Sequence, residues 1–222
     1  MVSVVIVAAG SGTRMGAGYN KIFMMLDGKT VLEQTVSVFL ECPEVDELLI
    51  VMSEGEIEKG KALFSNVPDI RFVCGGATRA DSVKNGVLAA MGDYVIVHDG
   101  ARPLIAEPMI RQVIAETKMH RAAAVGVICK DTVKKLDPDG MIRTTLDREK
   151  MIQIQTPQGF EKELLLKAYQ KFPDRKPTDE CGYMELLQIP VKFITGSYEN
   201  LKLTTPEDLV IAENILKRRK KV

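Results

Sequence analysis

Near its N-terminus the chain reads Val2-Ser-Val-Val-Ile-Val-Ala-Ala-Gly-Ser-Gly-Thr-Arg-Met-Gly16. Residues 2–7 form a mainly apolar run that is typical of a buried strand. The glycines that follow let backbone N–H groups approach phosphate oxygens closely. Arg14 and Lys21 add a guanidinium and an ammonium, which can neutralise the charge that grows as a phosphorus–oxygen bond breaks. The stretch therefore predicts a strand followed by a loop that binds a nucleoside triphosphate.

Two better-known glycine loops fit this stretch less well. The dinucleotide-binding pattern has two residues before its third glycine, whereas Gly10, Gly12 and Gly16 leave three. No helical period begins directly after the loop, and the first clear helix start is Thr30, which begins a capping box. The P-loop tripeptide occurs only at residues 28–30, without the required upstream glycine and strand. We therefore expect neither a dinucleotide oxidoreductase nor a P-loop enzyme.

The 222-residue chain is electrically balanced, with 30 basic and 30 acidic residues. This balance gives no reason to expect a nucleic-acid surface or a membrane partner. No stretch approaches the roughly 18 apolar residues of a spanning helix, and no secretory signal is evident, so we expect a cytoplasmic protein. The cysteines are scattered without a C-x-x-C pair, which favours buried free thiols over a zinc site or disulfides. They are Cys42, Cys74, Cys129 and Cys181.

Strand-length apolar runs alternate with amphipathic stretches along the chain. The predicted strands cover residues 2–8, 48–52, 70–73, 94–98 and 122–129, and the predicted helices 30–40, 56–64, 78–91 and 108–119. This alternation predicts an α/β fold with a Rossmann-like, mostly parallel sheet and helices on both faces. We expect a single domain over residues 1–222. The loops after the strands should meet at the carboxyl edge of the sheet, where ligands of such sheets bind.

The helical period disappears between Asp131 and Asp147, where two short strands are predicted around the turn Asp137-Pro-Asp-Gly140. A two-stranded ribbon alone is marginal in water, so we expect this hairpin arm, about 131–147, to rest on the same arm of a second subunit. The resulting hypothesis is a homodimer. The cations that end the chain complement the negative end of the last predicted helix, and we do not interpret them as a nucleic-acid-binding tail.

A carboxylate and a guanidinium follow the fourth predicted strand, in the segment His98-Asp-Gly-Ala-Arg-Pro103. Mg²⁺ takes one or two protein carboxylates and completes its shell with water and substrate phosphates, so Asp99 alone can hold it beside a triphosphate. Asp99 can also cap the next turn, and Arg102 is either a phosphate clamp or the ion-pair partner of Asp99. The glycine loop favours the metal, and we expect Mg²⁺ as the cofactor.

A second glycine turn, Gly75-Gly76, leads into a helix start at Thr78, with Ser82 in the first turn of that helix. The Ser82 hydroxyl and the backbone amides of the turn can read the edge of a nucleobase, or the segment is a plain helix entry. Four further residues are candidates for binding an anionic second substrate, although each taken alone is an ordinary surface residue. They are Arg148, Thr156, Thr178 and Lys202.

Several motifs occur in order over nearly the whole chain. They are Ala8–Met15 with Lys21, Gly75-Gly76 with Arg79 and Ser82-Val83, His98–Pro103, Thr156-Pro-Gln-Gly-Phe160, and Lys202-Leu-Thr204 with Pro206-Glu-Asp208. Together they resemble the 2-C-methyl-D-erythritol 4-phosphate cytidylyltransferase family. Similar first loops occur in other nucleotidyltransferases, but the His98–Pro103 and Thr156–Phe160 segments together narrow the resemblance to this family and its close relatives that act on polyol phosphates.

The resemblance implies a nucleotidyltransferase that transfers CMP from CTP to 2-C-methyl-D-erythritol 4-phosphate and releases pyrophosphate, a step of non-mevalonate isoprenoid precursor biosynthesis. It implies that Arg14 and Lys21 stabilise the transition state at the α-phosphorus. It further implies that Arg148, reaching across from the partner subunit, and Lys202 position the polyol phosphate, and that Asp99 holds Mg²⁺. The implied nucleotide-binding residues are Ala8, Ala9, Gly10, Gly12, Gly75, Gly76, Ser82 and Asp99, and the implied substrate-binding residues are Arg102, Thr156 and Thr178.

One segment departs from the family pattern, because Asn20-Lys-Ile22 stands where the family usually carries Pro-Lys-Gln. Losing proline frees the backbone before Lys21, so the ordering of this loop is open. The attacking phosphate oxygen is already ionised at neutral pH, since the second pKa of a phosphate monoester is about 6, and no catalytic base is expected. Two alternatives remain, a ribitol-5-phosphate cytidylyltransferase that makes CDP-ribitol and a CTP-binding module without turnover.

Overall fold

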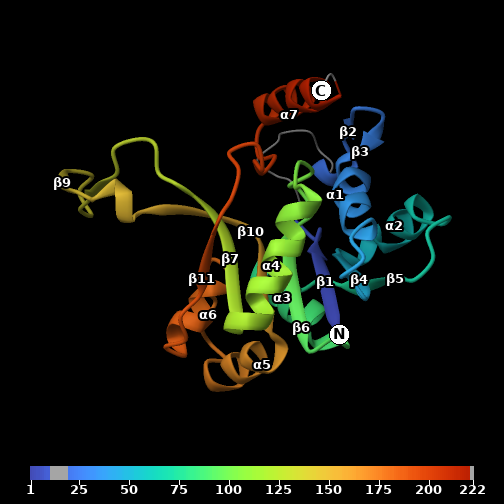
Figure 1. Cartoon of the computed structure of the whole chain (residues 1–222), viewed down its shortest axis with the longest axis horizontal. Coiled ribbons are helices and arrows are strands. Elements are labelled where there is room, and N and C mark those ends of the chain that lie inside the picture. The colour runs from blue at the N-terminus through green and yellow to red at the C-terminus, as the bar shows by residue number, and fades with distance from the viewer. Residues whose placement is uncertain (11–19, 221–222) are drawn as a thin grey trace.

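The computed structural model describes residues 1–10 and 20–220. Its central sheet is built from β1 (Val2–Val7), β4 (Glu47–Met52), β5 (Ile70–Cys74), β6 (Tyr94–Asp99), β7 (Ala122–Ile128), β10 (Ile152–Glu161) and β11 (Lys192–Thr195). The strand order is β11-β7-β10-β6-β1-β4-β5 (Figure 1). Strand β10 runs antiparallel to β6 and β7, and the other neighbouring pairs are parallel. The prediction of a mostly parallel sheet is confirmed.

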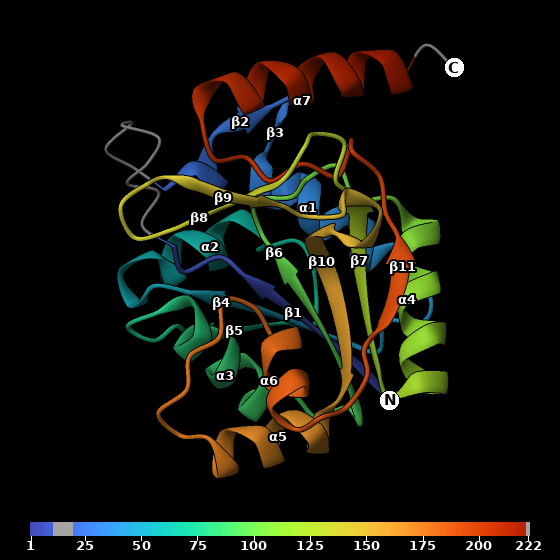
Figure 2. The ribbon, with the colours of Figure 1, turned by 90° about the vertical axis from the view of Figure 1, so that its left-hand side faces the viewer.

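Helices cover both faces of this sheet, as predicted (Figure 2). One face packs against α1 (Val31–Leu40), α2 (Ile57–Leu63) and α4 (Glu107–His120), and the other against α3 (Arg79–Ala89), α5 (Lys162–Lys171) and α6 (Cys181–Leu186). Strand β1 shows why an apolar run is needed here: Val4 and Ile6 enter the first core and Val5 enters the second. No helix in the described ranges is both long and apolar enough to span a membrane.

Local capping signals begin three of the helices. In α1 and α3, the side chains of Thr30 and Thr78 accept the N3 backbone N–H, and the N3 carboxylate accepts the N–H of the cap residue. At the start of α7 (Pro206–Arg219), the Asp208 carboxylate accepts the N–H of Thr205. Such a cap satisfies donors that a helix start leaves unpaired and is worth about 1 kcal/mol. The sequence signal and the structure therefore agree at these starts. Helix α7 packs on a small hairpin of β2 (Met25–Leu26) and β3 (Lys29–Thr30) through a satellite core.

Strands β10 and β11, like helices α5 and α6, were not predicted from the sequence. The alternation Ile152-Gln-Ile-Gln155 was an available strand signal, but the buried part of β10 that follows is polar and interrupted by Pro157. The thiol prediction needs one correction: Cys74 is exposed, whereas Cys42, Cys129 and Cys181 are buried and free. The C-terminal cations also have partners in the fold, since Arg218 and Arg219 pair with Glu199, and Lys220 pairs with Asp27.

The hairpin arm is present as an antiparallel pair of β8 (Lys134–Leu136) and β9 (Ile142–Thr145). Its turn is closed by the Gly140 N–H, which donates to the Asp137 carbonyl, and Gly140 has a φ of +80°, which favours glycine. Every residue of both strands is exposed, and Figure 1 shows the arm projecting away from the sheet.

Candidate active site

A cavity of about 400 Å³ lies at the carboxyl ends of β1 and β6. The strand order reverses at this point, because the chain moves from β1 to β4 and β5 on one side and then crosses to β6 on the other. Loops predicted from separate parts of the sequence converge here, as expected. The predicted site residues that line the cavity are Ala8, Ala9, Gly10, Lys21, Gly76, Ser82, Asp99 and Lys202.

The other predicted residues fall into two groups. Arg14 and Gly12 lie outside the described residues. Within the described ranges, Gly75, Arg102, Arg148, Thr156 and Thr178 are not part of the cavity lining. Arg148 belongs to the 3-10 helix η4 (Arg148–Lys150) beside the arm, where its Nη1 donates to the Lys130 carbonyl at 2.8 Å. Thr178 lies in the exposed connection between α5 and α6.

Three cations surround the carboxylate of Asp99, which ends β6 and is 6% exposed. Its Oδ2 is 2.8 Å from Lys202 Nζ and 3.6 Å from Arg102 Nε, and its Oδ1 is 3.3 Å from Arg79 Nε. Burial alone would raise the pKa of Asp99, but the positive charges of Lys202 and Arg79 outweigh it and lower this pKa well below its usual range. Asp99 is therefore ionised at neutral pH.

Glu180 forms an ion pair with Arg79 of this cluster. It was not among the residues predicted from the sequence. Its two oxygens each accept a hydrogen bond from a different Arg79 nitrogen, both at 3.1 Å, and the residue is 1% exposed. Burial would lower the pKa of Arg79, but the charges of Glu180 and Asp99 outweigh it and raise this pKa. The cluster thus has three cations and two carboxylates, which leaves a net positive charge where polyphosphate is expected.

A chain of hydrogen bonds joins His98 and Thr156 to the backbone of Asp99. His98 Nε2 lies 3.2 Å from the Arg102 carbonyl, which can only accept, so this nitrogen carries the proton. The Thr156 hydroxyl then donates to His98 Nδ1 at 3.1 Å and accepts the Asp99 N–H at 3.0 Å. Burial lowers the pKa of His98 to about 4, which keeps the ring neutral.

Thr156 is only 3% exposed. Its hydroxyl donates one hydrogen bond and accepts one within the protein, which orients the backbone of Asp99. The expected contact of Thr156 with the substrate phosphate stays a prediction. Arg102 adopts the ion-pair arrangement, one of the two alternatives for this residue. Its Nη1 donates to the Asn200 carbonyl at 2.7 Å while its Nε faces Asp99. Its expected role in binding the substrate stays a prediction.

The second glycine turn forms one wall of the cavity. Gly76 donates its N–H to the Ser82 hydroxyl at 3.0 Å, and this hydroxyl donates to the Thr78 carbonyl at 2.9 Å. Gly75 packs so closely that a Cβ there would meet the Cβ of Ala9 at 2.6 Å. Ser82 therefore holds the turn together, and the absence of side chains at 75–76 brings it against the loop that follows β1.

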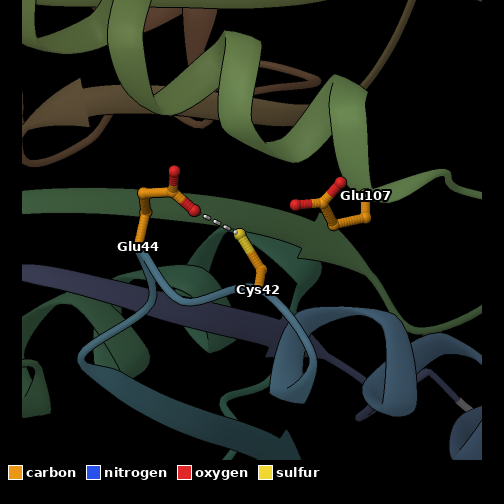
Figure 3. Close-up of side chains that lie close together, drawn as sticks. All are labelled: Cys42, Glu44 and Glu107. Atoms are coloured by element: carbon orange, nitrogen blue, oxygen red, sulfur yellow. Dashed lines mark hydrogen bonds between the residues drawn. The ribbon is translucent and has the colours of Figure 1, made fainter.

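Asp99 is also the carboxylate that fits a metal delivered with a triphosphate, since one ionised oxygen ligand facing the cavity suffices when phosphates supply the others. Elsewhere in the described ranges, Cys42, Glu44 and Glu107 bring three ligand atoms within 4.8 Å of one another (Figure 3). None of these three lines the cavity, and Arg111 forms ion pairs with both carboxylates. The positive charge of Arg111 therefore already balances the carboxylates of Glu44 and Glu107.

Comparison with known proteins agrees with this site. The model of one protein family, described as IspD, 2-C-methyl-D-erythritol 4-phosphate cytidylyltransferase, matches residues 2–218. A protein of that name from Dehalococcoides mccartyi is 44% identical over 98% of this chain and 96% of its own length. One from Bacillus cereus is 37% identical over the full length of both.

Solved structures of proteins with related names are also similar to this chain. The 4-diphosphocytidyl-2C-methyl-D-erythritol synthase of Anaerococcus prevotii superposes with a TM-score of 0.89 at 31% identity, covering 98% of this chain and 96% of that one. The cytidylyltransferase of Thermus thermophilus superposes with a TM-score of 0.80 at 30% identity, covering 97% and 98%. On this evidence, the chain belongs to the IspD family of 2-C-methyl-D-erythritol 4-phosphate cytidylyltransferases.

Proposed function

We propose that the chain transfers CMP from CTP to 2-C-methyl-D-erythritol 4-phosphate and releases pyrophosphate. The observation that carries the proposal is the positive cluster around Asp99, at a cavity that Lys21 also lines, in a chain of this family. Two highly anionic substrates need such a site in order to meet. Because the attacking phosphate oxygen is ionised near neutral pH, its second pKa being about 6, catalysis requires no side-chain base. A buried, neutral His98 agrees with that chemistry.

Each charged residue has a distinct role in this proposal. Lys21, together with Arg14 outside the described residues, neutralises the charge that develops on the α-phosphate and the departing pyrophosphate. Lys202 binds the phosphate of the polyol. Asp99 would hold Mg²⁺, and the ion would supply further positive charge at the triphosphate. Arg79 stays charged beside Asp99 because Glu180 and Asp99 both face it.

The part of the cavity that we assign to the nucleotide is lined by small residues. Ala8, Ala9 and Gly10 follow β1, and the same cavity is lined by Gly76 from the turn before α3 and by Ser82 from its first turn. Gly75 packs behind this wall against Ala9. We propose that cytidine lies between these two segments, because their described residues that line the cavity carry small side chains.

We further propose that the chain is a single domain that acts as a homodimer in the cytoplasm. The arm supports the dimer, since Leu136, Met141 and Ile142 are more than half exposed on it. A ribbon with such side chains is stable only when another surface covers it. Arg148 beside the arm would then serve the partner's cavity, which agrees with its place outside the lining of its own.

Release of pyrophosphate tests the function directly. Purified protein is supplied with CTP, Mg²⁺ and either 2-C-methyl-D-erythritol 4-phosphate or ribitol 5-phosphate. We expect turnover with the first polyol phosphate, and a loss on the order of a hundredfold in Lys21→Ala, comparable to the removal of an oxyanion donor. Turnover with ribitol 5-phosphate alone would reassign the second substrate. Tight CTP binding with no turnover on either would leave a binding module.

A further inference from the structure

The turn that carries Lys21 is held by the side chain that precedes it. Asn20 caps the 3-10 helix η2 (Lys21–Phe23), and only 4% of its surface is exposed. Its Oδ1 accepts the Ile22 N–H at 3.3 Å. Its Nδ2 donates to the Ala8 carbonyl at 3.1 Å and to Glu56 Oε2 at 3.0 Å, which uses both amide protons.

Both acceptors of the Asn20 amide belong to rigid parts of the fold. Ala8 follows β1, and its N–H donates to the carbonyl of Val51 in β4 at 2.8 Å. Glu56 ends the 3-10 helix η3 (Glu54–Glu56), and its Oε2 also accepts the hydroxyl of Ser53 at 2.5 Å. Asn20 thus connects the Lys21 turn to the carboxyl ends of two neighbouring strands of the sheet.

The far side of the turn is held by an apolar contact. Ile22 is 2% exposed and belongs to the core that includes Ile6, Leu32 and Phe39. Its burial fixes the backbone on one side of Lys21, as the Asn20 hydrogen bonds fix it on the other. The two residues that differ from the usual family pattern are therefore the two anchors of the turn.

We propose that Asn20 and Glu56 form a latch that positions Lys21 for the triphosphate, an inference that rests on the proposed function of the site. The backbone of Asn20 has φ −68° and ψ 124°, which is the φ that a proline ring would impose. Hydrogen bonds from the side chain replace the constraint of the ring. Both latch residues are positioning residues, because their polar atoms contact protein groups.

The first test combines kinetics with amide hydrogen exchange. Removal of the side chain in Asn20→Ala is expected to lower kcat about tenfold, since small displacements of a catalytic group are costly, while KM for the polyol phosphate changes little. Exchange of amides 21–26 in the substrate-free protein should become about tenfold faster, because the turn opens locally. Val113→Ala, in the core of α4 and away from the cavity, is the control for general loss of stability.

An exchange of donor and acceptor tests the latch itself. Asn20→Asp keeps the acceptor for Ile22 but places a second carboxylate against Glu56, so kcat should fall further than in Asn20→Ala. The double variant Asn20→Asp/Glu56→Gln restores a donor–acceptor pair between residues 20 and 56 but not the bond to the Ala8 carbonyl. It should therefore recover part of the kcat that Asn20→Asp loses, as coupled neighbours do. Glu56→Ala carries the test if Asn20→Ala does not fold.

The possible results distinguish a failure of the latch proposal from a failure of the proposed function. A wild-type chain without turnover rejects the proposed function, and the exchange measurement then decides about the latch. Unchanged exchange at 21–26 together with unchanged kcat in Asn20→Ala would overturn the latch, even where turnover by the wild-type chain supports the function. The same holds if Val113→Ala reproduces both effects, or if the double variant shows no recovery.

Discussion

The Nζ atom of Lys202 lies 2.8 Å from Oδ2 of Asp99, although the two residues are 103 positions apart. This ion pair joins the loop before α7 to the end of β6. In the proposed reaction Lys202 binds the polyol phosphate and Asp99 holds the metal. In the protein alone, these two side chains pair with each other. Substrate and metal therefore compete with a contact within the protein.

Lys202→Ala tests this competition. Loss of a charged hydrogen bond to phosphate, worth about 1.5–3 kcal/mol, should raise KM for the polyol phosphate at least tenfold. Asp99 also loses a competing cation, so the Mg²⁺ concentration for half-maximal rate should fall several-fold. Steady-state kinetics with each component varied measures both effects, with Lys217→Ala on the exposed surface of α7 as the control. A higher Mg²⁺ requirement in Lys202→Ala would contradict the competition.

Gly75→Ala tests the nucleotide wall. A Cβ at this position would lie 2.6 Å from the Cβ of Ala9 and 3.0 Å from Ser82 Oγ, so the two segments must move apart. We expect KM for CTP to rise about tenfold with little change in KM for the polyol phosphate. Gly55→Ala is a matched control, because a Cβ there meets nothing within 4 Å. Equal effects of the two substitutions on CTP would argue against the wall.

The parts of this fold that sequence analysis predicted have local causes. Thr30 and Thr78 predict helix starts because their capping partners lie three residues away. The apolar run of β1 predicts a buried strand because both of its faces are covered. The convergence of the loops then follows from the parallel topology, since the carboxyl ends of parallel strands meet at one edge.

What the sequence did not predict depends on long-range pairing. Glu180 meets Arg79 across 101 positions, and no local pattern indicates that pair. The orientation of Arg102 depends on the carbonyl of Asn200, which is 98 positions away, so the sequence alone allows both a phosphate clamp and an ion pair. The position of the Thr156 hydroxyl behind Asp99 depends on the pairing of β10 with β6, which no local pattern indicates.

The neutral state of His98 predicts a pH dependence of stability. Its pKa is about 4 in the folded protein, below the ordinary value near 6.5, because burial penalises the charged ring. The unfolded chain therefore binds the extra proton first. The contribution of His98 is fully present above pH 6.5 and is lost as the pH falls toward 4, and it amounts to on the order of 3 kcal/mol.

Denaturant unfolding of the wild-type chain and His98→Gln between pH 7 and 4 measures this contribution. The free energy of unfolding of the variant should vary less with pH, by on the order of 3 kcal/mol over the window. Turnover of His98→Gln at pH 7 should fall less than tenfold, since the imidazole is not expected to transfer a proton. Loss of nearly all turnover in a folded variant would instead support a histidine mechanism.

Arg148 provides a test of subunit exchange in the proposed homodimer. If its side chain completes the cavity of the partner, Arg148→Ala and Lys21→Ala are each inactive as homodimers but complement one another when mixed. In a heterodimer, the subunit with an intact Lys21 receives an intact Arg148 from its partner, while the other cavity carries both defects. Random re-association makes half of the dimers mixed, each with one working cavity, so about a quarter of wild-type turnover should return.

Lys21→Ala mixed with Lys202→Ala is the control. Both residues line the cavity of their own chain, so every cavity in this mixture carries one of the two defects. Mixing should therefore return no more turnover than the average of the two homodimers. No recovery with Arg148→Ala, in a mixture shown by mass to contain heterodimers, would place Arg148 in its own subunit's site or outside the reaction.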